Sequence, residues 1–204
     1  MNKIRIRNDN EINERKIIFF EIINILKKRN ITFFLDGGIL LGAIRENNFI
    51  KWDWDVEISV FSKDLLKFYK EISSDLQKNN FHIKRLNLAL FNPKIEFFKK
   101  NHNATSFSIL GWHYSFFRQA YTRKKMKIPL KFMRKMGKVK FFEKNFLCPS
   151  PINEYLKHRY GNWEKPIQTS DKSKYFSDEF YQKNFSFFDF FNAIFNLIYK
   201  FFKK

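Results

Sequence analysis

The order of apolar and polar positions along the chain predicts helices and strands that build a covered sheet. Over residues 11–29, apolar side chains recur at helical spacing, and charged residues such as Arg15 occupy the remaining surface. A polar break at Arg29-Asn30 separates this helix from the apolar run 31–35, which we expect to be a short strand that enters a tight turn. The first helix is therefore expected to pack on a sheet.

The middle of the chain adds one helix and several strands to this pattern. Residues 63–79 carry an apolar stripe and predict a helix that Ser62 caps at its N-terminus. Three short strands are expected after it, over residues 81–86, 88–91 and 94–98. Residues 99–127 show no readable period, but they contain basic side chains suited to a diphosphate, namely Arg118, Arg123, Lys124 and Lys125.

The C-terminal part predicts a hairpin and two helices. Residues 128–151 are typical of a basic β-hairpin around Gly137, and residues 152–160 of a helix. Residues 185–204 predict an amphipathic helix with a narrow polar stripe, which suits either a membrane interface or docking on its own domain or on a second subunit. The expected class is α+β, a mixed sheet flanked by helices with an amphipathic helix at the C-terminus.

Acidic residues at every second position mark the most unusual stretch of the chain. Asp53, Asp55 and Glu57 fall in a β-branched and aromatic run, 53–61, that predicts a strand, so their carboxylates are expected on one face. Such oxygen ligands suit Mg²⁺ or Mn²⁺. The alternative is an edge strand with a solvated acidic face. The chain has 20 acidic residues against 39 basic ones, so acidic clustering runs against its composition.

A glycine turn precedes this strand. The sequence Asp36-Gly37-Gly38 predicts a turn where the backbone approaches another group closely, and residues 39–44 predict a short helix whose first amides face a phosphate. A Gly-Gly pair alone is usually only a turn. Together with the carboxylates that follow, it indicates a site where backbone amides and a metal ion hold nucleotide phosphates.

The two halves of this stretch resemble the signature of the LicD family of phosphotransferases, which includes the fukutin-related proteins. The family pattern runs Gly-Gly-Thr-Leu-Leu-Gly-Ala-x-Arg and then Phe-Ile-Pro-Trp-Asp-x-Asp-x-Asp. The chain departs from it at Ile39, Lys51 and Glu57. The matching residues are Gly37, Gly38, Leu40, Leu41, Gly42, Ala43, Arg45, Phe49, Ile50, Trp52, Asp53 and Asp55. A later run resembles the closing element of the family, with matches at Pro149, Tyr155, Leu156, Tyr160, Gly161, Trp163 and Pro166.

The resemblance implies a nucleotidyltransferase-like fold and transfer of a substituted phosphate, such as phosphocholine or ribitol phosphate, from a CDP-linked donor to a glycan or lipid-linked glycan of the cell envelope, such as lipopolysaccharide or capsule. Asp53 and Asp55 would hold Mg²⁺, and Gly37, Gly38 and Arg45 would bind the substrate, with Arg45 equally suited to bracing the acidic loop. The resemblance also places a third carboxylate on a later strand, for which Glu96 is the candidate. Glu57 competes with it for the metal shell or for the acceptor proton. The catalytic domain is expected over 1–170, with a linker and helix over 171–204.

Charge and composition leave two other functions open. The net charge of +19 points to nucleic acid or to an anionic membrane surface. A nucleotidyltransferase acting on RNA or a small molecule would use the same carboxylates, and a non-catalytic basic protein would bind nucleic acid with steep salt dependence. Nucleic acid is the less favoured partner, because its binding does not explain Asp53 and Asp55. No secretory signal or run of about 18 apolar residues is seen, so we expect a cytoplasmic protein, peripheral on the inner membrane face if residues 185–204 bind it.

Overall fold

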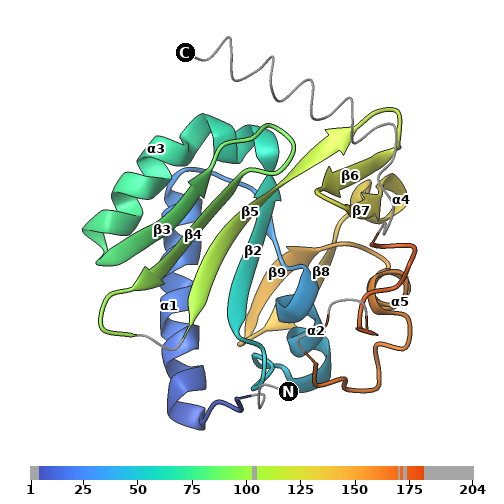
Figure 1. Cartoon of the computed structure of the whole chain (residues 1–204), viewed down its shortest axis with the longest axis horizontal. Helices are drawn as coiled ribbons and strands as arrows, with labels where there is room; N and C mark the ends of the chain where they lie inside the picture. Colours follow the sequence, from blue (N-terminus) through green and yellow to red (C-terminus); the bar gives the residue numbers. More distant parts are fainter. Residues whose placement is uncertain (1–4, 103–104, 170, 172–173, 182–204) are drawn as a thin grey trace.

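A mixed seven-stranded sheet forms the centre of the fold (Figure 1). The computed structural model describes residues 5–102, 105–169, 171 and 174–181. The main strands follow the order β1-β2-β5-β4-β3, and β6 and β7 extend the sheet beyond β5. The strands are β1 (Phe33–Phe34), β2 (Asp55–Phe61), β3 (Phe81–Asn87), β4 (Lys94–Lys99), β5 (Ser106–Ser115), β6 (Ala120–Arg123) and β7 (Met126–Pro129). Only the β2–β5 pair of this sheet is parallel among the described strands.

Helices and a small hairpin surround this sheet. The helices are α1 (Asp9–Lys28), α2 (Gly37–Glu46), α3 (Ser62–Lys78), α4 (Leu130–Met133) and α5 (Ile152–Tyr160), and the hairpin is β8 (Gly137–Phe141) with β9 (Lys144–Cys148). The guanidinium of Arg29 at the end of α1 binds the buried Asp75 of α3, with 2.8 Å between Nη2 and Oδ2, which joins these two helices. The prediction of an α+β fold with a mixed sheet flanked by helices is confirmed.

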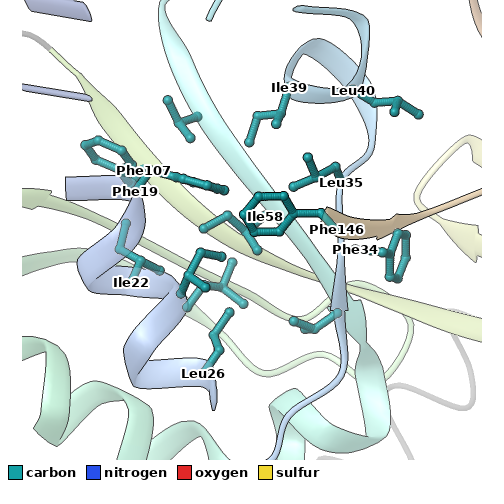
Figure 2. Packing of buried hydrophobic residues seen from close by; sticks show 14 of the residues in the cluster. Phe19, Ile22, Leu26, Phe34, Leu35, Ile39, Leu40, Ile58, Phe107 and Phe146 are labelled. Carbon is teal, nitrogen blue, oxygen red and sulfur yellow. The ribbon is translucent and has the colours of Figure 1, made fainter. Parts of the chain in front are cut away.

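Aromatic and aliphatic side chains from α1 meet the sheet and the hairpin in one core. Figure 2 shows Phe19, Ile22 and Leu26 of α1 among residues from β2, β5 and β9. The Phe19 ring is fully buried and lies edge-on to Phe49 and Phe141, with centroids 5.8 and 5.9 Å apart. Because such edge-to-face pairs add to the burial of large rings, Phe19 links α1 to the hairpin that supports α2.

Several expected boundaries were wrong, for local reasons. Residues 88–91 form no strand, because the side chain of Asn87 closes a turn by accepting from Ala89 N and donating to Asn92 O. Ser62 does not cap α3. Phe61 occupies the cap position, and Ser62 Oγ finds no hydrogen-bond partner among the described residues. The hairpin turns at Phe142-Glu143 and not around Gly137, which begins β8.

The structure also shows what residues 99–127 build. They contain β5, the longest strand of the described sheet, which is buried from Phe107 to Trp112. A strand covered on both faces lacks the alternation of polar and apolar residues that reveals a strand in sequence. Arg15 is a further correction, because it is 1% exposed and not on the surface of α1.

The C-terminal segment is described in part. Tyr181 pairs with Met126 of β7, and the neighbouring Phe180 is fully buried, so Phe180 and Tyr181 pack on the domain. The helix expected over 185–204 lies outside the described residues. Among the helices that are described, none is long and apolar enough to cross a membrane.

Replacing Phe19 by Ala should lower the free energy of unfolding by about 3–5 kcal/mol, because a buried ring is lost and a cavity remains. Chemical denaturation monitored by circular dichroism measures this loss. Ile17→Ala on the same helix is the control, since Ile17 is 62% exposed. Equal losses for both variants would contradict the assigned packing.

Candidate active site

A cavity of about 420 Å³ opens between α2, the start of β2, the β6–β7 hairpin and α5 with the chain that follows it. Its walls combine carboxylates, guanidinium groups and aromatic rings. The lining residues are Gly38, Leu41, Arg45, Ile50, Trp52, Asp53, Trp54, Asp55, Glu57, Arg123, Met126, Arg159, Tyr160, Asn162, Trp163, Lys165, Ile167, Thr169, Tyr175 and Phe176. This is the cavity in which most of the expected site residues meet.

Three carboxylates form one wall of this cavity. Asp53 precedes β2, while Asp55 and Glu57 lie on the strand two positions apart and therefore on one face. Burial raises the pKa of Asp53 to about 6. The charge of Arg15 opposes this rise, and that of Glu57 adds to it. The site therefore holds Asp53 in an environment that resists its negative charge.

Glu96 lies apart from this wall. In the sheet register Glu57 is opposite Ser108 of β5, and Ser108 is opposite Glu96 of β4, so Glu96 is two strands away on the same face. It does not line the cavity. Its carboxylate contacts Lys84 at 3.4 Å and Lys94 at 3.2 Å. Burial acts to raise the pKa of Glu96, but hydrogen bonding and charge from Lys94, and then from Lys84, lower it. The structure thus brings Glu57, and not Glu96, to Asp53 and Asp55.

The two glycines allow the start of α2 to touch the acidic wall. Gly37 has φ +63°, a conformation that L side chains rarely adopt. A Cβ atom at Gly38 would lie only 2.1 Å from Oδ2 of Asp53, so only glycine lets this carboxylate lie against the first turn of the helix. The predicted close approach of the backbone is therefore made to the protein's own Asp53.

A buried network fixes this turn to α5. Asp36 caps α2 by accepting from Gly37 N at 2.7 Å, and the same oxygen, Oδ1, accepts from Arg159 Nη1 at 2.8 Å and from the Tyr155 hydroxyl. Asp36 and Arg159 are 5% and 4% exposed. Although burial lowers it, the charge of Asp36 holds the pKa of Arg159 well above its usual range. None of these three residues had a predicted role in the site. The spacing of Tyr155 and Arg159 by one helical turn was the sequence signal that could have placed them side by side.

Two further arginines support the acidic segment from outside the cavity. Arg7 Nη2 donates to the carbonyl of Trp54 at 3.1 Å, and Arg15 Nε donates to Thr105 Oγ1 at 2.6 Å. Burial lowers the pKa of Arg15 to about 9, and the charges of Asp53 and Asp55 oppose this. The positive charge of Arg15 thus acts on Asp53 and Asp55. The helical pattern alone had placed Arg15 on the surface.

Basic and aromatic groups complete the cavity. Arg45 of α2 lines the cavity. In the described part of the chain, no ion pair or hydrogen bond holds its guanidinium. The alternative prediction, that Arg45 braces the acidic loop by an ion pair, therefore finds no partner there. Trp163 and Tyr160, which the family-like closing element contains, also face the cavity. Flat rings beside cationic groups suit a ligand that carries both a ring and an anion.

The carboxylates offer oxygen ligands to a hard divalent cation, but they do not form a complete set of ligands. Within the residues that the structure describes, no group of three or more His, Cys, Asp and Glu side chains is arranged to hold a metal ion. Asp53 and Asp55 offer two carboxylates, and Mg²⁺ is commonly held by one or two carboxylates together with substrate phosphates. The two aspartates therefore fit a metal whose coordination the substrate completes.

Asp36→Asn should lower the free energy of unfolding by about 3–5 kcal/mol, because it leaves the buried Arg159 charge without its partner. Urea denaturation near neutral pH measures the change. Asp9→Asn is the matched control, since the Asp9 side chain is 83% exposed and pairs only at the surface with Lys51. A loss below about 1 kcal/mol in Asp36→Asn would contradict the role of the buried pair.

Known proteins share short or distant similarity with this chain. Ribitol 5-phosphate transferase FKRP from Mus musculus and from Homo sapiens each share 34% identity over 44 residues, which is 22% of this chain and 9% of the relative. The lincomycin-bound lincosamide antibiotic adenylyltransferase LnuA has 12% identity and a TM-score of 0.48, covering 95% of this chain and 98% of that chain. ANT(2″)-Ia in complex with adenylyl-2″-tobramycin has 10% identity and a TM-score of 0.46, covering 67% and 70%.

The match to a family profile is broader than these pairwise similarities. The profile of the LicD/FKTN/FKRP nucleotidyltransferase domain matches residues 30–151, which include α2, the acidic segment and β2 to β9. The matched region is more than half of the chain, whereas the aligned stretch is a small part of the FKRP proteins. The chain belongs to the LicD/FKTN/FKRP family of nucleotidyltransferase domains.

Proposed function

We propose that this protein is a metal-dependent phosphotransferase that moves a phospho-substituted group from a CDP-linked donor to a hydroxyl of a cell-envelope glycan. The observation that carries this proposal is the cavity that Asp53, Asp55 and Arg45 line together and in which Asp53 lies against Gly38 at the start of α2. Family membership supports a transferase of this kind. The FKRP relatives are named as ribitol 5-phosphate transferases, which supports a substituted phosphate as the transferred group.

The chemistry requires close positioning and neutralisation of phosphate charge more than covalent help from the protein. The acceptor oxygen forms a bond to the phosphorus of the transferred group, the bond to the bridging oxygen breaks, and CMP leaves with that oxygen. Asp53 and Asp55 would hold Mg²⁺ or Mn²⁺, which supplies charge neutralisation for the diphosphate when bound. Arg45 binds a phosphate oxygen through its guanidinium fork.

Glu57 is the residue we assign to the acceptor proton. It lies on the same strand face as Asp55 and lines the cavity, whereas Glu96 does not line it and contacts two lysines. A carboxylate beside the attacking hydroxyl takes its proton as the new bond forms. Asp53 and Asp55 would hold the metal ion together with the donor phosphate, which would leave Glu57 for proton transfer.

Asp53→Asn and Asp55→Asn should each lower CMP release by about a thousandfold, because loss of a metal ligand removes several kcal/mol of charge stabilisation. Release is measured with CDP-choline and CDP-ribitol, Mg²⁺ or Mn²⁺ and a cell-envelope glycan extract. Asp9→Asn, at the exposed surface, should retain wild-type release. No release from either donor by the wild type, or release that persists in EDTA, would refute the proposal.

Gly38→Ala should lower CMP release by about a hundredfold without unfolding the protein, since a displacement of about 1 Å in a reacting group has that effect. The added Cβ would overlap Oδ2 of Asp53 and move the carboxylate. Ile44→Ala is the control on the same helix, because Ile44 is 36% exposed and does not line the cavity. Thermal melts of both variants separate displacement of Asp53 from loss of the fold. Unchanged release in a folded Gly38→Ala variant would exclude the assigned contact.

A further inference from the structure

Two buried arginines from different elements face the same cavity. Arg123 ends β6 and Arg159 lies in the last turn of α5, and they are 5% and 4% exposed. Both line the cavity that contains Asp53. The sequence marked Arg123 only as one of several basic residues, and it gave Arg159 no role. Only folding brings these two side chains to the same cavity, so the sequence alone could not pair them.

Both guanidinium groups retain unused donors. The Nε atoms of Arg123 and Arg159 are buried and have no hydrogen-bond partner within the described ranges. Arg159 uses Nη1 for Asp36 at 2.8 Å and for the Tyr155 hydroxyl at 3.1 Å. The guanidinium of Arg123 makes no hydrogen bond to another side chain or carbonyl within the described residues. A buried guanidinium with an unpaired donor is costly, so an anion in the cavity that neutralises the two charges would stabilise the site.

The two charges also act on one another. Burial lowers the pKa of Arg123, and the charge of Arg159 lowers this pKa further. The negative charges of Glu57 and then of Asp36 act in the opposite direction. Asp36 is already engaged by Arg159 and Tyr155, so it neutralises only part of the pair. The cavity is therefore lined by two like charges that a bound anion would neutralise.

The first turn of α2 lies beside one of these guanidinium groups. Arg159 Nη2 lies 2.9 Å from the position that a Cβ atom of Gly37 would occupy, so this guanidinium rests directly against the N-terminus of the helix. The amides and dipole at such a terminus favour an anion. α2 spans Gly37–Glu46, which is long enough for this effect.

We propose that Arg123 and Arg159, together with the first turn of α2, form a built anion site that binds the diphosphate of the nucleotide donor. The assignment deepens the proposed function and rests on it. Guanidinium forks match phosphate oxygens bidentately and keep their charge when buried. Arg159 lies beyond the region that the family profile matches, so α5 supplies half of this site from outside that region.

The test measures binding of inorganic pyrophosphate by isothermal titration calorimetry in EDTA and low salt. Arg123→Gln should weaken binding about tenfold or more, since it removes a charged group that would neutralise the phosphate. Arg159→Lys should weaken it similarly while keeping a positive charge beside Asp36, which protects the fold. Arg134→Gln removes the same charge from an exposed position and should leave the affinity within about twofold of the wild type.

Two further ligands identify the group that is bound. CDP should lose affinity in Arg123→Gln as pyrophosphate does, whereas cytidine, which lacks phosphate, should bind both proteins alike. The proposal is overturned if the wild type does not bind pyrophosphate, if Arg134→Gln weakens binding as much as Arg123→Gln, or if Arg123→Gln leaves CDP binding unchanged. Because these titrations contain no metal and no acceptor, failure of CMP release would leave their result unaffected.

Discussion

The buried pair of Asp36 and Arg159 is the contact on which the site depends. It fixes the N-terminus of α2 to α5, two elements separated by more than a hundred residues, and both side chains are almost fully covered. Asp36 also accepts from the first amide of α2, so one carboxylate sets the start of the helix and the position of α5. A pair of this kind is costly to break because its remaining member would be buried and charged. The cavity between the two elements is thereby given a fixed shape.

Opposite charges around the cavity explain why both kinds can be buried there. Burial raises the pKa of Asp53, so its negative charge is unfavourable, and burial lowers the pKa of Arg15, whose charge acts on Asp53. Arg123 is likewise disfavoured as a cation. Each group is stabilised by a partner of opposite sign, and a site that holds both a cation and a phosphate would satisfy both walls. The protein's large positive net charge is a separate property, because lysines spread over the chain contribute most of it.

The sequence predicted the elements that carry local patterns and missed those that depend on distant contacts. The helix over 11–29, the glycine turn and the acidic strand were visible because periodicity, glycine and alternating carboxylates are local signals. β5 was not, since a strand buried on both faces shows no alternation. Glu96 could not be separated from Glu57 by sequence, because the choice depends on the register of β2, β5 and β4. Arg15 and Arg159 were missed because their roles depend on what the folded chain places beside them.

The position of the glycines connects these observations. The sequence led us to expect that Gly37 and Gly38 serve a bound phosphate. In this fold each glycine also makes room for a protein side chain: Arg159 lies against Gly37 and Asp53 lies against Gly38. A cation and an anion thus reach the same helical turn from opposite walls of the cavity. The diphosphate of the proposed donor would face a metal ion at the carboxylates and the guanidinium groups at the other contact, and this arrangement would keep both within one turn of backbone. The glycine pair therefore determines the distance between the two walls, and any side chain there would separate them.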